Sequence, residues 1–205
     1  MTTISSWPVV LRSGLVITDP LSVVLGILAR WRLDLSGPSQ PGSFGEPDLR
    51  LANRGGARIS AAQIGAVLER RDAIEQALGA IDPGVSLSAA EHSLPWLPLQ
   101  QLFDAFAGIS GVGFAKMTKA LHPKRPALIP MLDSIVQKYL AADDPGAKAP
   151  FGPRALDLVH GYKRDLDRNV AAVRAVQEEL ARHGYDITEV RILDLLILSV
   201  AGLSS

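Results

Sequence analysis

The feature of the chain that most suggests chemistry is an aspartate that follows a pair of glycines. Gly111, Val112 and Gly113 precede a basic, helix-like stretch, and Asp133 lies twenty positions after Gly113. Two glycines separated by one apolar residue allow a tight left-handed turn between short helices. Backbone amides at the start of the second helix can then bind a phosphate oxygen. A carboxylate at a fixed distance from such a turn would act on the sugar or base of a nucleic acid, although packing corners between helices use the same glycines.

Basic residues cluster around this aspartate. The segment 114–138 contains five basic residues and one acid, a local balance of +4. A cluster of this kind can contact several phosphates, and a solvated helix face has the same composition. We expect the basic pair before Pro126 to lie on a loop, where it would bind the backbone of a strand. The five basic residues are Lys116, Lys119, Lys124, Arg125 and Lys138.

This region resembles the helix-hairpin-helix DNA glycosylase superfamily. Residues 109–113, Ile-Ser-Gly-Val-Gly, are similar to the superfamily's L-P-G-V-G turn, with Ser110 in place of proline. Residues 133–138, Asp-Ser-Ile-Val-Gln-Lys, are similar to the D-x-x-V-x-R sequence that follows it, with Lys138 in place of arginine. The resemblance is specific over this region only. The same region also looks like that of a set of uncharacterised actinobacterial proteins.

The resemblance implies a monofunctional DNA glycosylase, which hydrolyses the N-glycosidic bond of a damaged or modified base rotated out of DNA. Asp133 would be the catalytic residue and would stabilise oxocarbenium-like charge at the sugar. Bifunctional relatives carry a Schiff-base lysine two residues after the second glycine. Ala115 occupies that position here, and Lys116 lies on a different helical face. No iron–sulfur cluster is expected, because the chain has no cysteine.

Two other hypotheses stay open beside the glycosylase. Asp133 has apolar neighbours on both sides, and an acid in the first turn of a helix that starts at Pro130 would be stabilised by the helix dipole by about 0.3–1 kcal/mol. In that case the protein could be a non-catalytic helix-hairpin-helix module that binds nucleic acid. It could also be a helical protein-interaction domain in which the Gly-Val-Gly sequence is only a corner.

Two aromatic residues in proline-rich segments are candidates for stacking on a flipped base, Trp96 and Phe151. The alternative is that both rings are buried as loop anchors. The four histidines do not pair at metal-ligand spacing, so we expect neither a metal nor another cofactor.

Composition limits the partners and the location. The 205 residues contain 21 basic and 21 acidic residues, which argues against a non-specific DNA coat. The most apolar stretch, residues 192–203, contains Asp194 and is shorter than the roughly 20 apolar residues that cross a bilayer. It predicts a buried C-terminal helix. Without cysteine or a signal peptide, the sequence favours a cytoplasmic protein whose partner is DNA and not a membrane.

These residues must be positioned by helices, because alanine and leucine are abundant and aromatics are sparse. We predict an all-α, glycosylase-like domain over residues 1–205, with about seven or eight helices and two lobes around a cleft. The segment 99–140 carries the hairpin and the aspartate. The predicted helices start at Pro20, Ser60, Leu99, Gly113, Pro130, Arg154 and Thr188, with loops at 36–47, 93–98 and 143–153. Ser60 and Gln63 form a capping box at the start of one long helix that ends at 79–83, and Gly184 ends the helix that starts at Arg154.

Overall fold

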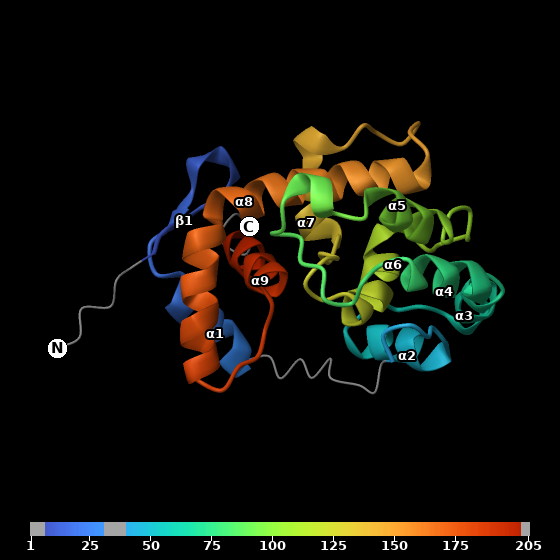
Figure 1. The fold of residues 1–205 in the computed structure, drawn as a ribbon, viewed down its shortest axis with the longest axis horizontal. Coiled ribbons are helices and arrows are strands. Elements are labelled where there is room, and N and C mark those ends of the chain that lie inside the picture. Colours follow the sequence, from blue (N-terminus) through green and yellow to red (C-terminus); the bar gives the residue numbers. More distant parts are fainter. Residues whose placement is uncertain (1–6, 31–39, 202–205) are drawn as a thin grey trace.

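The computed structural model describes residues 7–30 and 40–201, and this part of the chain is mostly helical (Figure 1). It contains nine α-helices and one short antiparallel sheet, in which β1 (Val9–Val10) pairs with β2 (Val16–Ile17). The all-α class is therefore confirmed. The helices are α1 Pro20–Arg30, α2 Glu46–Arg54, α3 Ala61–Leu68, α4 Arg71–Gly79, α5 Trp96–Asp104, α6 Phe114–Leu121, α7 Ser134–Tyr139, α8 Phe151–Arg182 and α9 Glu189–Ala201.

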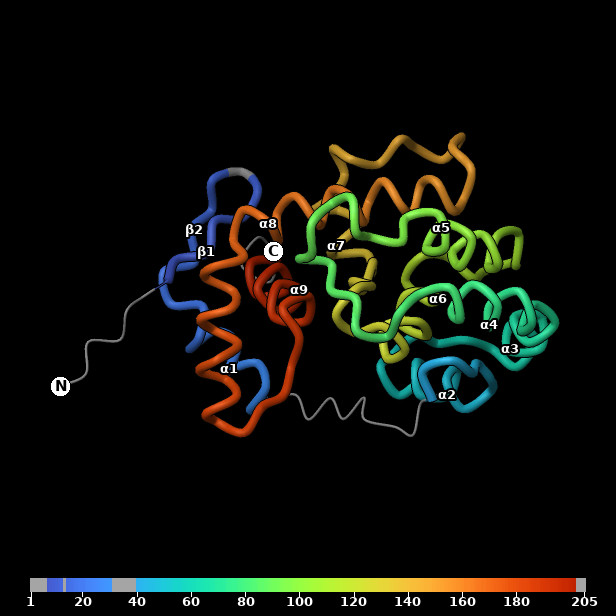
Figure 2. Tube along the Cα trace, viewed as in Figure 1, coloured from blue at the N-terminus to red at the C-terminus, as the bar shows by residue number. Residues whose placement is uncertain are grey.

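The two ends of the described chain lie on the same side of the molecule. The sheet, α1 and α9 gather there around one part of the long helix α8, while α2 to α6 occupy the other side (Figure 2). The short helix α7 lies between the two groups, packed on α9 (Figure 1). A single cluster of buried, mainly aliphatic side chains runs from Val9 to Ile197 and joins all of these elements.

Helix boundaries with a local capping signal agree with the sequence. Asp19 Oδ1 accepts a hydrogen bond from the Ser22 amide ahead of α1, and Ser60 and Gln63 form the predicted capping box of α3. Gly184 ends α8 with a φ of 82°. Thr188 caps α9.

Two predictions about the N-terminal half are wrong. The helix that begins after Ser60 is not continuous, because Arg70 leaves the helical region with φ −102° and ψ 9° and separates α3 from α4. The predicted loop 36–47 also contains the start of an unpredicted helix, α2. Pro47 lies in its first turn, where a missing amide costs nothing, and Asp48 Oδ2 accepts a hydrogen bond from the Gly45 amide. Residues 36–39 of that loop lie outside the described residues.

Two proline-rich segments predicted to be loops also begin helices. Helix α5 starts at Trp96 with Pro98 in its first turn, and α8 starts at Phe151 with Pro153 in its first turn. The first amides of a helix have no partner within it, so proline is tolerated there. Within the described residues, no helix is both long and apolar enough to cross a membrane.

Candidate functional site

The Gly-Val-Gly sequence forms a hairpin turn between α5 and α6. The Val112 amide donates to the Ile109 carbonyl at 3.1 Å, and Gly111 has a φ of 71°. This combination is typical of a type II turn, in which the third residue needs a positive φ. Val112 is buried, so the middle residue of the motif anchors the turn to the core. Helices α5 and α6 flank this turn, and residues 105–113 connect them.

The two glycines have different surroundings. A Cβ at Gly111 would collide with the side chain of Gln63, whose Nε2 donates to the Ser110 carbonyl at 3.2 Å. Gly111 is therefore also a packing position. Gly113 is the N-cap of α6, and a Cβ there would meet no atom within 4 Å. Gly113 is exposed, so the space beside the N-cap of α6 is open.

The lysines on α6 have protein partners. Lys116 Nζ donates to Gln63 Oε1 at 2.7 Å, and Lys119 Nζ donates to the Gly55 carbonyl at 3.1 Å. Both side chains are half-buried. Lys116 joins α6 to α3, and Lys119 joins α6 to the loop after α2. Lys138 on α7 is exposed. Phosphate binding by these three lysines stays a prediction.

The basic pair before Pro126 is not on an accessible loop, so this prediction is wrong. Lys124 is 3% exposed and forms an ion pair with Asp48 at 2.7 Å. Arg125 is 1% exposed. Its guanidinium donates to main-chain carbonyls that include those of Leu78 and Ile81 at the end of α4. Lys124 therefore binds α2, and Arg125 binds the end of α4, to the segment that follows α6.

Two arginines that were not predicted as site residues lie at the end of α2, the helix that packs on α6, and in the loop that follows it. Arg54 ends α2, and Arg58 follows in the next loop; both are exposed. Arg58 has a φ of 55°, and the loop is closed by two hydrogen bonds between the Asn53 side chain and the main chain of Ile59. A left-handed non-glycine residue fixed in this way often marks a functional loop. In the sequence, the only indication of this loop as a basic site was the pair of arginines on either side of Gly55 and Gly56.

Asp133 is a helix N-cap. Residues 129–133 are not helical, so the helix predicted to start at Pro130 begins instead at Ser134. Asp133 Oδ1 accepts hydrogen bonds from the amides of Ile135 and Val136 at 2.9 and 3.0 Å. Within the described residues, Oδ2 accepts no hydrogen bond, and the side chain is half-buried.

The segment before Asp133 is bound on both sides. The Leu132 amide donates to Thr118 Oγ1 at 3.0 Å, and that hydroxyl donates to the Phe114 carbonyl in the first turn of α6. On the other side, the Met131 amide donates to Asp194 Oδ2 of α9 at 3.3 Å. Helices α6 and α9 therefore fix the position of Asp133 relative to the hairpin.

Asp194 is a second carboxyl group in this region. It is 4% exposed, and its Oδ1 has no hydrogen-bond partner in the described part of the chain. Burial raises its pKa to about 7 against the attraction of Arg191, and the negative charge of Asp133 raises the pKa further. The sequence showed this residue as an acid in an apolar stretch, but its proximity to Asp133 is a tertiary feature.

A buried histidine opposes the pH dependence that Asp194 gives to stability. Burial lowers the pKa of His122 to about 4, although its Nδ1 is hydrogen-bonded to the Ile129 carbonyl. Native Asp194 binds its proton more tightly than the unfolded chain does, so its contribution to stability falls as pH rises from about 4 to about 7. Native His122 binds its proton less tightly, so its contribution rises between about pH 4 and 6.5.

We expect the Asp194→Asn variant to show the contribution of His122 to the pH dependence of stability. The free energy of unfolding of this variant should rise by about 3 kcal/mol between pH 4 and 6.5, while that of the wild-type chain changes much less, because its two slopes oppose each other. Urea titrations at several pH values measure both profiles. The double variant Asp194→Asn/His122→Asn is the control and should lose the rise. Parallel profiles for the wild type and the Asp194 variant would contradict this assignment.

The two aromatic candidates are packed. The Trp96 ring lies 4.0 Å from the ring of His160, and the Phe151 ring lies 4.7 Å from that of Phe114, as measured between centroids. Both side chains are partly buried against the core. Because neither residue lies on a loop and each ring already has a stacking partner, the structure favours the alternative in which they act as anchors.

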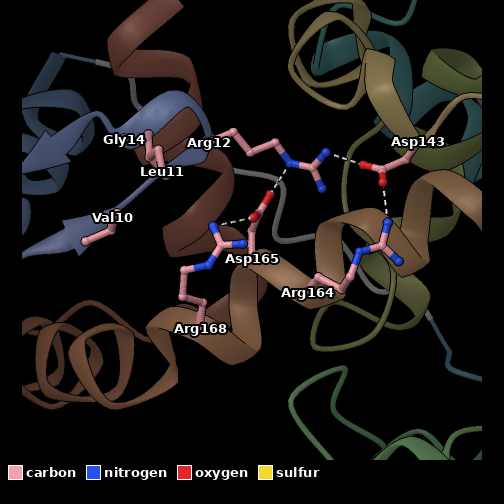
Figure 3. A pocket seen from close by; sticks show the side chains of 8 residues that line it. All are labelled: Val10, Leu11, Arg12, Gly14, Asp143, Arg164, Asp165 and Arg168. Carbon is pink, nitrogen blue, oxygen red and sulfur yellow. Dashed lines mark hydrogen bonds and ion pairs between the residues drawn. The ribbon is translucent and has the colours of Figure 1, made fainter.

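The described residues contain no group of three histidine, aspartate or glutamate side chains placed to bind a metal ion. They do contain a pocket of about 480 Å³, lined by Arg12, Asp143 and other charged side chains (Figure 3). None of the residues predicted from the sequence lines this pocket.

Comparison with known proteins gives one family. No curated protein and no solved structure matches the chain. Residues 36–200 match the model of a family of unknown function, DUF6308. This match contains the hairpin, the Asp133 segment and the helix that carries Asp194, and it covers most of the sequence. The chain therefore belongs to the DUF6308 family.

Proposed function

We propose that this protein is a monofunctional DNA glycosylase of the helix-hairpin-helix kind, with Asp133 as its catalytic carboxylate. The observation that carries the proposal is the arrangement of Asp133 and α6. One oxygen of Asp133 caps α7, the other accepts no hydrogen bond from the described residues, and Thr118 ties the adjoining main chain to the helix behind the hairpin.

The hairpin would bind the phosphate of a DNA strand. Gly113 leaves space in front of the first amides of α6, which can donate to a phosphate oxygen. The exposed Arg54 and Arg58 would extend this contact along the strand. Helix α7 lies between the two groups of helices (Figure 1), and we assign the flipped base to this region.

The proposed reaction is hydrolysis. The bond between C1′ and the base nitrogen breaks, and its electron pair leaves with the base. The carboxylate of Asp133 stabilises the positive charge that develops on the sugar. Water adds its oxygen to C1′ and gives one proton to Asp133 Oδ2. The departing base takes one proton from solvent, and Asp133 later returns its proton to solvent, so one water molecule is consumed. An abasic sugar and a free base are the products.

A lyase step is not part of the proposal. Ala115 occupies the position where a Schiff-base lysine would be needed. Lys116 is the next residue in the sequence, and its Nζ donates a hydrogen bond to Gln63. We therefore expect the abasic strand to remain intact until it is treated with alkali.

The test is release of free base from duplexes that carry different natural modifications, measured by mass spectrometry. We expect one base to be released with an equal amount of alkali-labile sites. Strand cleavage without alkali would contradict the monofunctional assignment. Absence of release from every duplex would contradict the catalytic proposal.

A second candidate function is a non-catalytic module that binds DNA. The two hydrogen bonds that Asp133 accepts as an N-cap explain its presence without any chemistry, and this observation favours the alternative. DNA binding that falls steeply with salt, with no base released, would support the module.

The exposed arginines give a prediction that tests the interface itself. We expect Arg54→Ala/Arg58→Ala to weaken duplex binding and to reduce the slope of log K against log salt by up to about 2, because two phosphate contacts are lost. Fluorescence anisotropy at several salt concentrations measures the slope. Arg174→Ala/Arg182→Ala, on the distant end of α8, removes the same charge and is the control. Equal slopes for the two double variants would show that Arg54 and Arg58 do not contact DNA phosphates.

A further inference from the structure

The pocket in Figure 3 lies where the turn after β1, the segment before α8 and one face of α8 meet. Three arginines and two aspartates line it: Arg12, Arg164, Arg168, Asp143 and Asp165. It shares no residue with the Asp133 region. A connection exists through α7, because the Tyr139 hydroxyl at the end of that helix accepts a hydrogen bond from the Arg12 amide at 3.0 Å.

Each aspartate in the pocket is shared by two arginines. Asp143 contacts Arg12 and Arg164, and Asp165 contacts Arg12 and Arg168. The local balance is +1. Both acids are therefore neutralised by the protein, and one positive charge remains for a ligand.

The acids and the bases differ in depth. The side chains of Asp143 and Asp165 are 12% and 1% exposed, whereas those of Arg164 and Arg168 are 59% and 51% exposed. A molecule that enters the pocket therefore meets guanidinium groups first, with the carboxylates beneath them. Since the pocket surface is positively charged and its acids are already paired, it favours an anion.

Guanidinium donors that have no acceptor among the described residues also favour an anion. A guanidinium has five N–H donors in a planar fork. Arg164 and Arg168 each donate only one hydrogen bond to the described residues, to Asp143 and Asp165 respectively. They are four positions apart on α8, so they extend from the same face of the helix. Two such forks suit the several oxygens of a phosphate group better than a single carboxylate.

Arg12 makes the site rigid. Its guanidinium contacts both aspartates, donates to the Gly161 carbonyl at 2.7 Å, and lies over the Tyr139 ring at 5.4 Å from the centroid. Asp143 and Asp165 in turn each accept one hydrogen bond from the guanidinium groups of Arg164 and Arg168 respectively. A preorganised site loses less conformational entropy when a ligand binds.

We propose that this pocket is a binding site for a dianionic phosphate group, held between Arg164 and Arg168. Two sources share this chemistry: free inorganic phosphate and the terminal phosphate of a nucleic-acid strand. Phosphate binding in this pocket does not depend on base excision. Either result of the test below therefore leaves the proposed function of Asp133 undecided.

Calorimetric titration of the full chain with inorganic phosphate, at constant ionic strength, tests the proposal. We expect saturable binding with a Kd below about 10 mM. Arg164→Gln/Arg168→Gln should raise the Kd at least tenfold and keep Arg12 and both aspartates in place. Arg174→Gln/Arg182→Gln removes two exposed arginines from the same helix and should bind phosphate as the wild type does.

A second titration separates the sources with one oligonucleotide that carries either a 5′-phosphate or a 5′-hydroxyl. Tighter binding of the phosphorylated strand than of inorganic phosphate, lost in the Arg164/Arg168 variant, supports the site and assigns it to strand ends. Equal binding of the two strands, with saturable inorganic phosphate, supports the site and assigns it to free phosphate. No saturable phosphate binding by the wild type, or equal affinity in the two double variants, would overturn the proposal. If the Arg164/Arg168 variant does not fold, the wild-type titration alone decides.

Discussion

Asp133→Asn is expected to abolish base release without unfolding the protein. Asparagine is as good an N-cap as aspartate, so its side-chain oxygen can still accept from the amides of Ile135 and Val136. What it lacks is the negative charge that would stabilise the sugar cation. We expect base release to fall by about 1000-fold or more, and the free energy of unfolding to change by less than about 1 kcal/mol.

A comparison of three substitutions separates the cap from the chemistry. Asp133→Ser also keeps a capping oxygen and should be as inactive as the asparagine variant. Asp133→Ala loses the cap as well and should destabilise the chain by about 1 kcal/mol. Urea unfolding and product analysis on the same samples give both quantities. If the asparagine variant releases base at the wild-type rate, Asp133 is a cap and nothing more.

Arg125→Met is expected to destabilise the protein by about 3–5 kcal/mol. Arg125 is 1% exposed, and its guanidinium donates to the carbonyls of Leu78 and Ile81, where α4 ends. Methionine fills much of the volume but provides no donor. The Ile81 carbonyl would lose its donor, and the Leu78 carbonyl would keep only its main-chain hydrogen bond from the Ile81 amide. A buried carbonyl left without a donor costs about 1–3 kcal/mol.

Thermal and urea unfolding measure this loss, with Arg182→Met as the control. Arg182 is an exposed residue whose ion pair with Glu179 lies on the surface, so its replacement should change stability by less than about 0.5 kcal/mol. Arg125→Lys keeps the charge and some donors and should be intermediate. If Arg125→Met is as stable as the wild type and binds DNA less tightly, the original assignment of Arg125 to the interface is correct.

Local sequence signals predicted the helix ends well. Asp19, Ser60, Gly184 and Thr188 each act within a few residues of their own position, through a cap or a left-handed residue. The same reasoning fails at Trp96 and Phe151, because proline occurs both in loops and in the first turn of a helix. The turn at 109–112 agrees with the sequence because Gly111, with its positive φ, also acts locally.

Burial of charge could not be predicted in this way. Lys124 and Arg125 belong to a basic run, and a count of charges cannot distinguish an exposed cation from one that is paired inside the protein. Their partners, Asp48 and the end of α4, are more distant in sequence and come close only after folding. The proximity of Asp194 to the Asp133 segment is set in the same way, by the packing of α9.

The most direct test is the yield of free base from one modified duplex, measured for the wild-type chain and for Asp133→Asn at equal concentrations of folded protein. We expect the wild type to release base together with an equal number of abasic sites, and the variant to bind the duplex equally well and release none. Equal release by the two proteins, or none by the wild type on any duplex that it binds, would contradict a catalytic role for Asp133.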